Sequence, residues 1–485
     1  KTSSRISSIR ELMPINSFLY PGAKVTTGYD VANSLRFNDG SSDYLTKSFG
    51  TTQTSTSKFT VSVWVKRCTL GTRQSIFAAY DGTSAGGDDL EFETDDTLSY
   101  NGTGAGVNTT SAKFRDVSAW YHIVLARDSA ASGASNQVKI YVNGTLQTLS
   151  ANNGCNSSQF LKSGLNSRIG TNQGASQYFV DMYMAELCVI DGQMLDATSF
   201  GEFDSDSPNI WKPIDVSGLT FGNNGFYLDF ENASSLGADV SGNSNNFTVN
   251  NLTSVDQSTD TCTNNFATLN PLQHALGATV PALSEGNLRT TNTIANKLQT
   301  QYSNFAVSSG KWYCEIKMTS GSVFVAGIST LNSQQAEGQS GENQNYPGLW
   351  SEGWGYYYTN GGIYNSGSVI ATYSTFTAGD IISIALDMEN EKLYFAKNGT
   401  FQNSADPASG SNGIDISSIA SNSDVVFGLA VEASSGGGTY GEFNFGSPPY
   451  AISSGNSDAN GYGNFEYSVP SGYYSINTKN LAEFG

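Results

Sequence analysis

The stretch VKIYVNG, residues 138–144, decides the fold class of this chain. Its apolar residues Val138, Ile140 and Val142 recur with the period of two that is typical of a β-strand with one buried face. The Asn-Gly pair that follows is the strongest short signal for a tight β-hairpin. Residues 393–400, LYFAKNGT, repeat the arrangement. We therefore expect one hairpin to occur twice, in two copies of one all-β architecture.

Strand patterns extend outward from these two hairpins. In the first half, Phe59–Lys66, Trp120–Ala126 and Phe179–Ile190 alternate or cluster apolar residues between turns rich in Gly, Asp and Asn. In the second half, Lys311–Met318 and Ile381–Asp387 do the same. Many short strands separated by turns predict antiparallel β-sandwiches or jelly rolls.

The length of 485 residues is too great for a single hydrophobic core. We expect two tandem antiparallel β-sandwiches, with Trp64 and Trp312 between the sheets of their respective sandwiches. The expected division is an N-terminal arm at 1–30, a first sandwich at 31–201, a connector with its own strand at 202–264, a second sandwich at 265–450 and a turn-rich C-terminal tail at 451–485.

The charge of the chain excludes several classes of partner. A formal net charge of −19 argues against nucleic-acid binding and against docking on anionic lipid, since both need an excess of Lys and Arg. No run of apolar residues is long enough to span a membrane, and the opening residues lack the apolar stretch of a signal peptide. We expect a protein that is assembled in a cytoplasm and then exposed outside the cell.

The five cysteines are odd in number and widely spaced, without a CxxC pair. With only two histidines, His122 and His274, neither a disulfide scaffold nor a zinc site is expected. Cys68, Cys188 and Cys314 fall inside apolar strand patterns and should be small buried side chains. His122 lies within a strand and is expected to be structural. No cofactor is required and no metal ligand is assigned, although Ca²⁺ remains possible without assigned ligands.

Two stretches of the chain resemble known domain families. The first half is similar to laminin-G-like domains of the concanavalin type, and the second half is similar to SPRY domains. The motifs that carry the first resemblance are FTVSVWVKR at 59–67, WYHIVLARD at 120–128, VKIYVNGTL at 138–146 and FVDMYMAELCVIDGQML at 179–195. Those that carry the second are GKWYCEIKM at 310–318, FVAGIS at 324–329, GDIISIALDMENEKLYFAKNGT at 379–400, VVFGLAVEA at 425–433 and GEFNFGSPPY at 441–450.

The segments between the domains, GFYLDFENASSLGADVSGNSNNFTVNN at 225–251 and NFATLNPL at 265–272, resemble those of tail-fibre and other appendage proteins of tailed phages. This resemblance implies a non-enzymatic protein of the virion surface that binds a host-surface glycan or protein and contacts other virion proteins. We expect a homo-oligomer, namely a trimer, because several copies would multiply weak contacts. The alternative is a capsid-decoration or connector protein without a receptor.

An aromatic cluster in the second half is the candidate ligand surface. Rings interleaved with glycines can stack on sugars while neighbouring polar groups bind hydroxyls. Strand alternation places Trp354, Tyr356 and Tyr358 on one face and Tyr357 on the other, and one of these sets should belong to the core. The candidate residues are Trp350, Trp354, Tyr356, Tyr357, Tyr358 and Tyr364.

One strand is rich in acids. Asp89, Glu91, Glu93 and Asp95 share a face at a period of two. A polysaccharide depolymerase, a less favoured alternative, would hold Glu91 and Glu93 close together in a cleft. Concanavalin-fold glycosidases carry a Glu-x-Asp-x-Glu order, and this strand does not. We therefore assign no catalytic residue and expect a solvated strand face.

Overall fold

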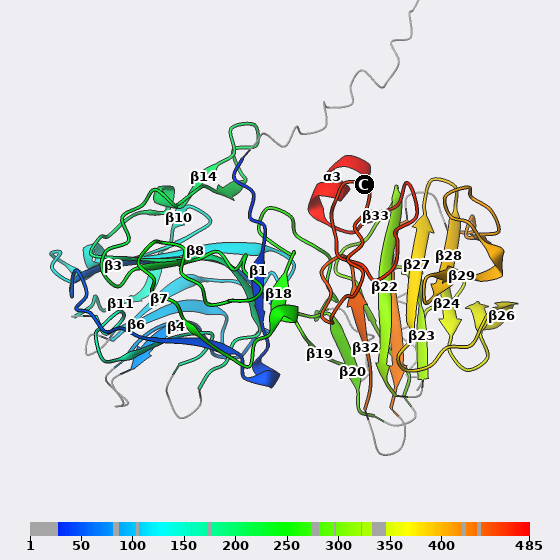
Figure 1. Ribbon diagram of the computed structural model, residues 1–485, viewed down its shortest axis with the longest axis horizontal. Helices are drawn as coiled ribbons and strands as arrows, with labels where there is room; N and C mark the ends of the chain where they lie inside the picture. The colour runs from blue at the N-terminus through cyan, green and yellow to red at the C-terminus, as the bar shows by residue number, and fades with distance from the viewer. Residues whose placement is uncertain are drawn as a thin grey trace, which may run out of the picture.

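The computed structural model describes residues 28–80, 87–102, 106–156, 158–172, 177–272, 281–294, 297–321, 323–331, 346–419, 423–433 and 438–485. Two β-sandwiches lie next to each other and the chain passes from one to the other (Figure 1). The predicted all-β fold with two antiparallel sandwiches is confirmed. Residues 1–27 of the predicted N-terminal arm, and His274, lie outside the described residues.

The first sandwich consists of two antiparallel sheets, each with eight strands in the described part of the chain. One sheet contains, in order, β10 (Thr145–Leu146), β9 (Val138–Val142), β8 (Trp120–Asp128), β3 (Lys58–Arg67), β13 (Met182–Asp191), β1 (Ser34–Phe37) and β18 (Gln257–Ser258), with β16 (Phe226–Leu228) paired to β13. The other contains β11 (Leu149–Asn152), β7 (Gly106–Lys113), β6 (Thr97–Gly102), β5 (Gly87–Phe92), β4 (Gln74–Tyr80), β12 (Asn166–Ile169), β2 (Tyr44–Ser48) and β17 (Thr248–Asn250).

Strand β3 buries both of its faces, and this changes the expected position of Trp64. Val61, Val63 and Val65 fill the space between the sheets, as the alternation predicted. Trp64 is buried on the opposite face of the sheet, in a second cluster that contains Trp211 from the connector. The prediction that Trp64 lies between the sheets is therefore wrong, because the connector covers the outer face and alternation alone cannot tell a core from a covered surface.

The segment predicted as a connector completes the first sandwich. Its strands β16, β17 and β18 pair with β13, β2 and β1, so that they extend both sheets. A hairpin formed by β14 (Gly201–Phe203) and β15 (Trp211–Pro213) lies over the outer face near β10 (Figure 1). The predicted connector strand is present as β16.

The second sandwich packs a nine-stranded sheet against a six-stranded one within the described residues. The larger sheet contains β19 (Ala282–Ser284), β20 (Arg289–Asn292), β32 (Thr439–Asn444), β22 (Lys311–Ser320), β27 (Ile381–Asp387), β28 (Lys392–Lys397) and β29 (Thr400–Phe401), with β30 (Ile414–Asp415) on β28 and β33 (Tyr474–Ser475) on β22. The smaller contains β21 (Gln299–Tyr302), β31 (Val425–Glu432), β23 (Val323–Thr330), β24 (Gly353–Tyr357), β25 (Gly362–Asn365) and β26 (Ser368–Thr372). Trp312 lies in the core between them, as predicted.

Both hairpins that the sequence predicted are present. Asn143 and Gly144 connect β9 to β10 with φ angles of 47° and 76°. Asn398 and Gly399 connect β28 to β29 with φ angles of 47° and 77°. The two turns use the same left-handed backbone, which Asn and Gly tolerate best.

The helical segments that lie wholly within the described residues are short. They are α1 (Ala134–Gln137), α3 (Thr478–Phe484) and the 3-10 turns η2 (Asp39–Ser41), η3 (Ala197–Ser199), η4 (Ser254–Asp256) and η5 (Gln402–Ser404). The C-terminal tail adds β33 and α3 to the second sandwich, where Phe484 stacks on Tyr474 with ring centroids 3.9 Å apart.

Buried polar contacts join the two sandwiches. Lys66 of β3 pairs with Asp260 at 2.7 Å and donates to the carbonyl oxygen of Phe266 at 3.0 Å. Arg36 of β1 donates to the carbonyl oxygen of Pro448 at 3.3 Å. Because these charges are shielded from water, the junction is a specific contact and not a loose linker.

Candidate functional site: a polar cleft on the first sandwich

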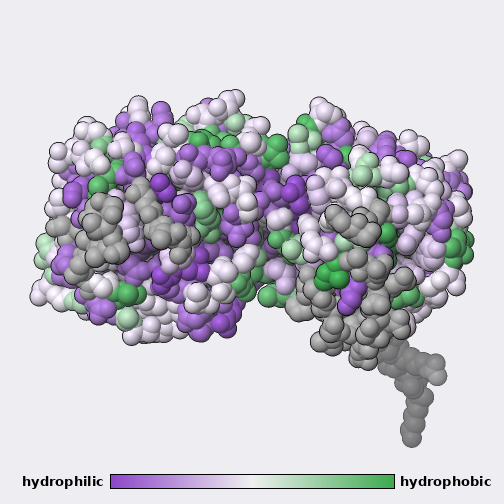
Figure 2. Space-filling model, turned by 90° about the horizontal axis from the view of Figure 1, so that it is seen from below, coloured by the Kyte–Doolittle hydropathy of each residue, from purple (hydrophilic) through white to green (hydrophobic). Residues whose placement is uncertain are grey.

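Strand β5 sends alternate side chains to the two faces of its sheet. Leu90 and Phe92 enter the core between the sheets. Asp89 and Glu91 lie on the outer face, on the shared face that the sequence predicted, but both are buried and not solvated as expected. This sheet forms the lower layer of the first sandwich in Figure 1, and the underside of that half is largely hydrophilic (Figure 2).

A cleft of about 450 Å³ opens on this outer face. One glycine in its lining leaves room for an aromatic ring, since a Cβ atom at Gly87 would lie 2.5 Å from the ring of Tyr80. The glycine at that position therefore allows the Tyr80 ring to lie across β5. The residues that line the cleft are Arg73, Tyr80, Gly87, Asp89, Glu91, Asn101, Gly102, Gly106, Val107, Asn172 and Tyr178.

A hydrogen-bond network fixes the acidic side chains of the cleft. Asp89 accepts from the hydroxyl of Ser75 and, at 3.0 Å, from the amide of Asn172. The Oε1 atom of Glu91 accepts from the amide of Asn101. These contacts hold both carboxyl groups in position against the sheet.

Arg73 connects two of the acids that the sequence singled out. Its guanidinium donates to Glu93 at 2.5 and 2.9 Å, and its Nε atom lies 3.6 Å from Oε2 of Glu91. It also lies over the ring of Tyr178, 5.2 Å from its centroid. Glu91 and Glu93 are thus close to the same cation.

Two acceptor atoms in the cleft lack a donor. Oε2 of Glu91 and Oδ1 of Asn101 are both buried without a hydrogen-bond partner among the described residues. Buried acceptors are normally satisfied, and leaving one unsatisfied costs about 1–3 kcal/mol. Such atoms are ready to receive donors from a ligand.

Burial controls the ionisation of these acids. It raises the pKa of Asp89 and of Glu91, and the neighbouring charge of Asp89 raises that of Glu91 further. The pair therefore resists carrying two negative charges unless a positive group lies nearby.

The structure separates the aromatic residues predicted as a ligand surface on the second sandwich. Trp354 and Tyr356 point into the core and are 2% and 0% exposed, so their placement on a ligand surface was wrong. Strand alternation predicted that one set of rings belongs to the core, and the β24 register places these two there.

The other candidate rings are accessible. Tyr357 and Tyr364 lie together on the outer face of the smaller sheet with ring centroids 5.6 Å apart. Tyr358 is half-buried against Phe324, and Trp350 is 37% exposed. A ligand role for these four residues remains a prediction.

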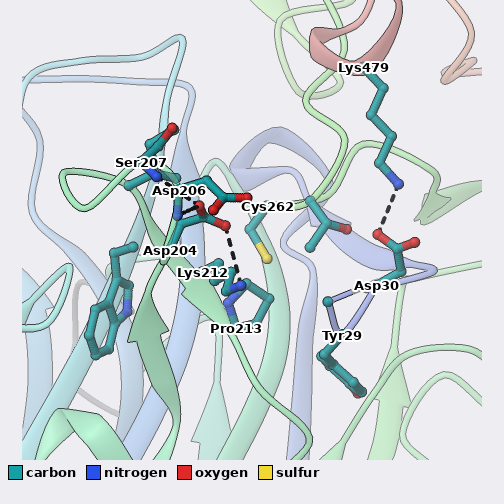
Figure 3. Close-up of a pocket in the computed structure, with 13 residues that line it drawn as sticks. Tyr29, Asp30, Asp204, Asp206, Ser207, Lys212, Pro213, Cys262 and Lys479 are labelled. Atoms are coloured by element: carbon teal, nitrogen blue, oxygen red, sulfur yellow. Dashed lines mark hydrogen bonds and ion pairs between the residues drawn. The ribbon is translucent and has the colours of Figure 1, made fainter. Parts of the chain in front are cut away.

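A second cavity, of about 310 Å³, lies where the β14–β15 hairpin, the segment at Tyr29 and helix α3 meet (Figure 3). Both of its lysines are held in ion pairs, since Lys212 contacts Asp204 at 3.3 Å and Lys479 contacts Asp30 at 2.9 Å. The cleft with unpaired acceptors is therefore the stronger candidate for a binding site.

The described residues contain no group of three or more His, Cys, Asp or Glu side chains that could hold a metal ion. In the same part of the chain, no helix has the length and apolarity to cross a bilayer. All five cysteines are unbridged, and Cys68, Cys188 and Cys314 are buried as predicted.

Sequence reasoning found the acids of the cleft but missed the side chains that surround them. Arg73, Tyr80, Asn101, Asn172 and Tyr178 come from other strands and turns. The pairing of Asp89 with Ala78 on β4 and with Asn101 on β6 brings these strands together. Only the strand register, which the sequence does not state, could have identified them.

Comparison with family models identifies both domains. Residues 39–196 match the Concanavalin A-like lectin/glucanases superfamily (Laminin_G_3), and residues 311–406 match the SPRY domain. The chain thus carries a laminin-G-like domain of the concanavalin type followed by a SPRY domain, as its motifs predicted. These domains fit a carbohydrate- or protein-binding role. Neither match bears on the resemblance to phage appendage proteins, which stays a prediction.

Solved structures resemble parts of the chain at low identity. The SPRY domain of human HERC1 is 19% identical over 32% of this chain and 87% of that one, with a TM-score of 0.25. A SAP-like pentraxin from Limulus polyphemus, crystallised as a native heptamer, is 18% identical over 35% of this chain and 80% of that one, with a TM-score of 0.27. Among curated proteins, none matches the chain.

Proposed function

We propose that this chain is a non-enzymatic recognition protein whose first sandwich binds a carbohydrate in the cleft beside β5. The observation that carries the proposal is the combination of the half-buried Tyr80 ring with two buried acceptors, on Glu91 and Asn101, that have no donor in the part of the chain that the structure describes. A sugar ring offers an apolar face to an aromatic side chain and polar hydrogens to carboxylate and amide oxygens.

The same network favours binding over hydrolysis. A retaining glycosidase needs a free carboxylate nucleophile and an acid roughly 5–5.5 Å apart. Here both oxygens of Asp89 accept hydrogen bonds, and Arg73 contacts both Glu91 and Glu93. These acids are tied to protein groups and not presented to a glycosidic bond.

A polysaccharide depolymerase is the second candidate, and one observation favours it. The two acids with raised pKa values lie in the same cleft, which is also an arrangement found in hydrolases. Incubation with soluble polysaccharides and measurement of new reducing ends separates the two proposals. We expect no release of product, and release that stops in a Glu91→Gln variant would make the protein an enzyme.

The proposed setting is the surface of a phage particle, where a homo-oligomer of the chain, which we propose to be a trimer, contacts a host-surface glycan or protein. Repetition of weak sites raises the overall affinity without any new contact. Analytical ultracentrifugation of the purified chain and localisation of the protein on intact particles test this setting. A monomer that is absent from particles would contradict it.

A glycan array probed with the labelled full chain tests the binding proposal. We expect selective binding that is lost in Tyr80→Ala and Asn101→Ala and retained in Trp350→Ala, whose side chain is exposed on the other sandwich. If Trp350→Ala abolishes binding while the two cleft variants do not, the ligand site lies on the second sandwich.

A further inference from the structure

The acceptors of the cleft also indicate the charge of its ligand. We infer that the sugar bound in the cleft carries a free amino group as an ammonium ion, so that the ligand class is a cationic amino sugar. This inference rests on the proposed carbohydrate site. The ammonium would lie between Glu91 and Asn101, beside Asp89.

The first argument is the match of donors to acceptors. Glu91 is 1% exposed, and its Oε2 atom has no hydrogen-bond donor among the described residues; its nearest cation, Nε of Arg73, is 3.6 Å away. The Oδ1 atom of Asn101 is also buried, and no described residue donates to it. An ammonium offers three donors and no acceptor, whereas a hydroxyl offers one donor and two lone pairs that the cleft would also have to satisfy.

The second argument is the balance of charge. The lining contains the carboxyl groups of Asp89 and Glu91, and Arg73 is its sole cation among the described residues. Arg73 is already held by Glu93, at 2.5 Å. The lining with Glu93 therefore has three carboxyl groups for one guanidinium, and a bound cation would stabilise the ionised forms of Asp89 and Glu91, whose pKa values burial raises.

Arg168, a neighbouring cation, does not change the ratio of carboxyl groups to cations in the cleft. It occupies β12, paired across β4 from the cleft, and it does not line the cleft. Its guanidinium lies 5.1 Å from the centroid of the Tyr44 ring and donates to the carbonyl oxygen of Asn172 at 3.3 Å. The excess of acid at Glu91 and Asp89 therefore remains.

The test is a calorimetric titration of the full chain with three trisaccharides: glucosamine trimer, its N-acetylated form and cellotriose. We expect the glucosamine trimer to bind about tenfold or more tightly than either neutral sugar, since a hydrogen bond to a charged group is worth roughly that factor. A neutral sugar that binds as tightly as the amine would overturn the inference and leave the carbohydrate site intact. No binding of any glycan, here or on the array, would instead remove the proposed function itself.

A charge-matched pair of variants separates the cleft from general attraction to an acidic protein. Glu91→Gln keeps the shape of the side chain, and Glu202→Gln removes one charge from an exposed position on the β14 hairpin. We expect Glu91→Gln to abolish the preference for the amine and Glu202→Gln to retain it. Equal loss in both variants would overturn the inference. If Glu91→Gln fails to fold, the test is the preference of the wild-type chain for the glucosamine trimer over the neutral sugars at 0.15 M salt. At that salt concentration, screening suppresses long-range attraction between the amine and an acidic protein, so a preference that is lost there would overturn the inference.

Discussion

The indole N–H of Trp211 donates a 2.9 Å hydrogen bond to Nδ1 of His122. The imidazole ring lies between two indoles, stacked on Trp64 with ring centroids 4.7 Å apart and on Trp211 at 6.0 Å. Its Nε2 atom is 2.8 Å from the hydroxyl of Ser62. Because Nδ1 accepts, the proton is on Nε2, and the histidine is a structural residue that fastens the β14–β15 hairpin onto the first sandwich.

Trp211→Phe should lower the free energy of unfolding by about 1–3 kcal/mol, because Nδ1 of His122 then loses its donor in a buried site. Urea denaturation followed by fluorescence measures this. Phe203→Leu in the same hairpin is the control, since its side chain is 48% exposed and should have a smaller effect. Equal effects would show that the hydrogen bond contributes nothing.

His122 should also make stability depend on pH. Burial lowers its pKa to about 3, below the ordinary value of 6.5. The unfolded chain takes up this proton first as the pH falls, so the contribution of the neutral histidine is complete above about pH 6.5 and is lost progressively down to about pH 3.

A His122→Gln variant isolates that contribution from the buried acids. Burial raises the pKa of Asp181 and Glu186 to about 7, and that of Asp43 to about 6. These carboxyl groups therefore increase the free energy of unfolding as the pH falls, which is opposite in sign to the effect of His122. The difference in unfolding free energy between wild type and variant should shrink between pH 6.5 and 3. A difference that stays constant would contradict the neutral state of His122.

The junction of the sandwiches should depend on Lys66. Lys66→Met leaves the buried carboxyl of Asp260 without its cation and should cost about 3–5 kcal/mol. The double variant Lys66→Met/Asp260→Asn should recover part of the loss. Lys58→Met, which removes the cation of a half-exposed pair with Asp128, is the control and should cost less than about 1 kcal/mol. Thermal unfolding of the variants measures these losses in the free energy of unfolding. Similar losses for Lys66→Met and Lys58→Met would contradict the account.

The aromatic residues of the second sandwich should contribute to stability according to how deeply each is buried. Trp354→Ala should cost about 3–5 kcal/mol, because a large core side chain is removed, whereas Trp350→Ala should leave stability within about 1 kcal/mol. Chemical denaturation of both variants checks the difference. Equal and small effects would place Trp354 outside the core.

The sequence was sufficient for the fold because its signals are local. Alternation in Phe59–Lys66 and the two Asn-Gly turns depend only on neighbouring residues, and the structure has strands and turns at these places. It could not show that Trp64 faces outward under a distant hairpin, since β3 is apolar on both faces.

The cleft was only partly predictable for the same reason. The acids of β5 share a face through strand geometry alone, and they were recognised as such. Their partners Arg73, Asn101 and Asn172 reach them through strand pairing, and burial of Asp89 and Glu91 follows from that assembly. Charge alone suggested a solvated surface, which is wrong for these two residues.

The most direct test of the central claim is a crystal structure of the full chain with an oligosaccharide selected on the glycan array. We expect the sugar in the cleft, with a ring against Tyr80 and polar hydrogens directed at Glu91 and Asn101. A sugar bound instead beside Trp350 and Tyr364, with the cleft holding only water, would contradict the account.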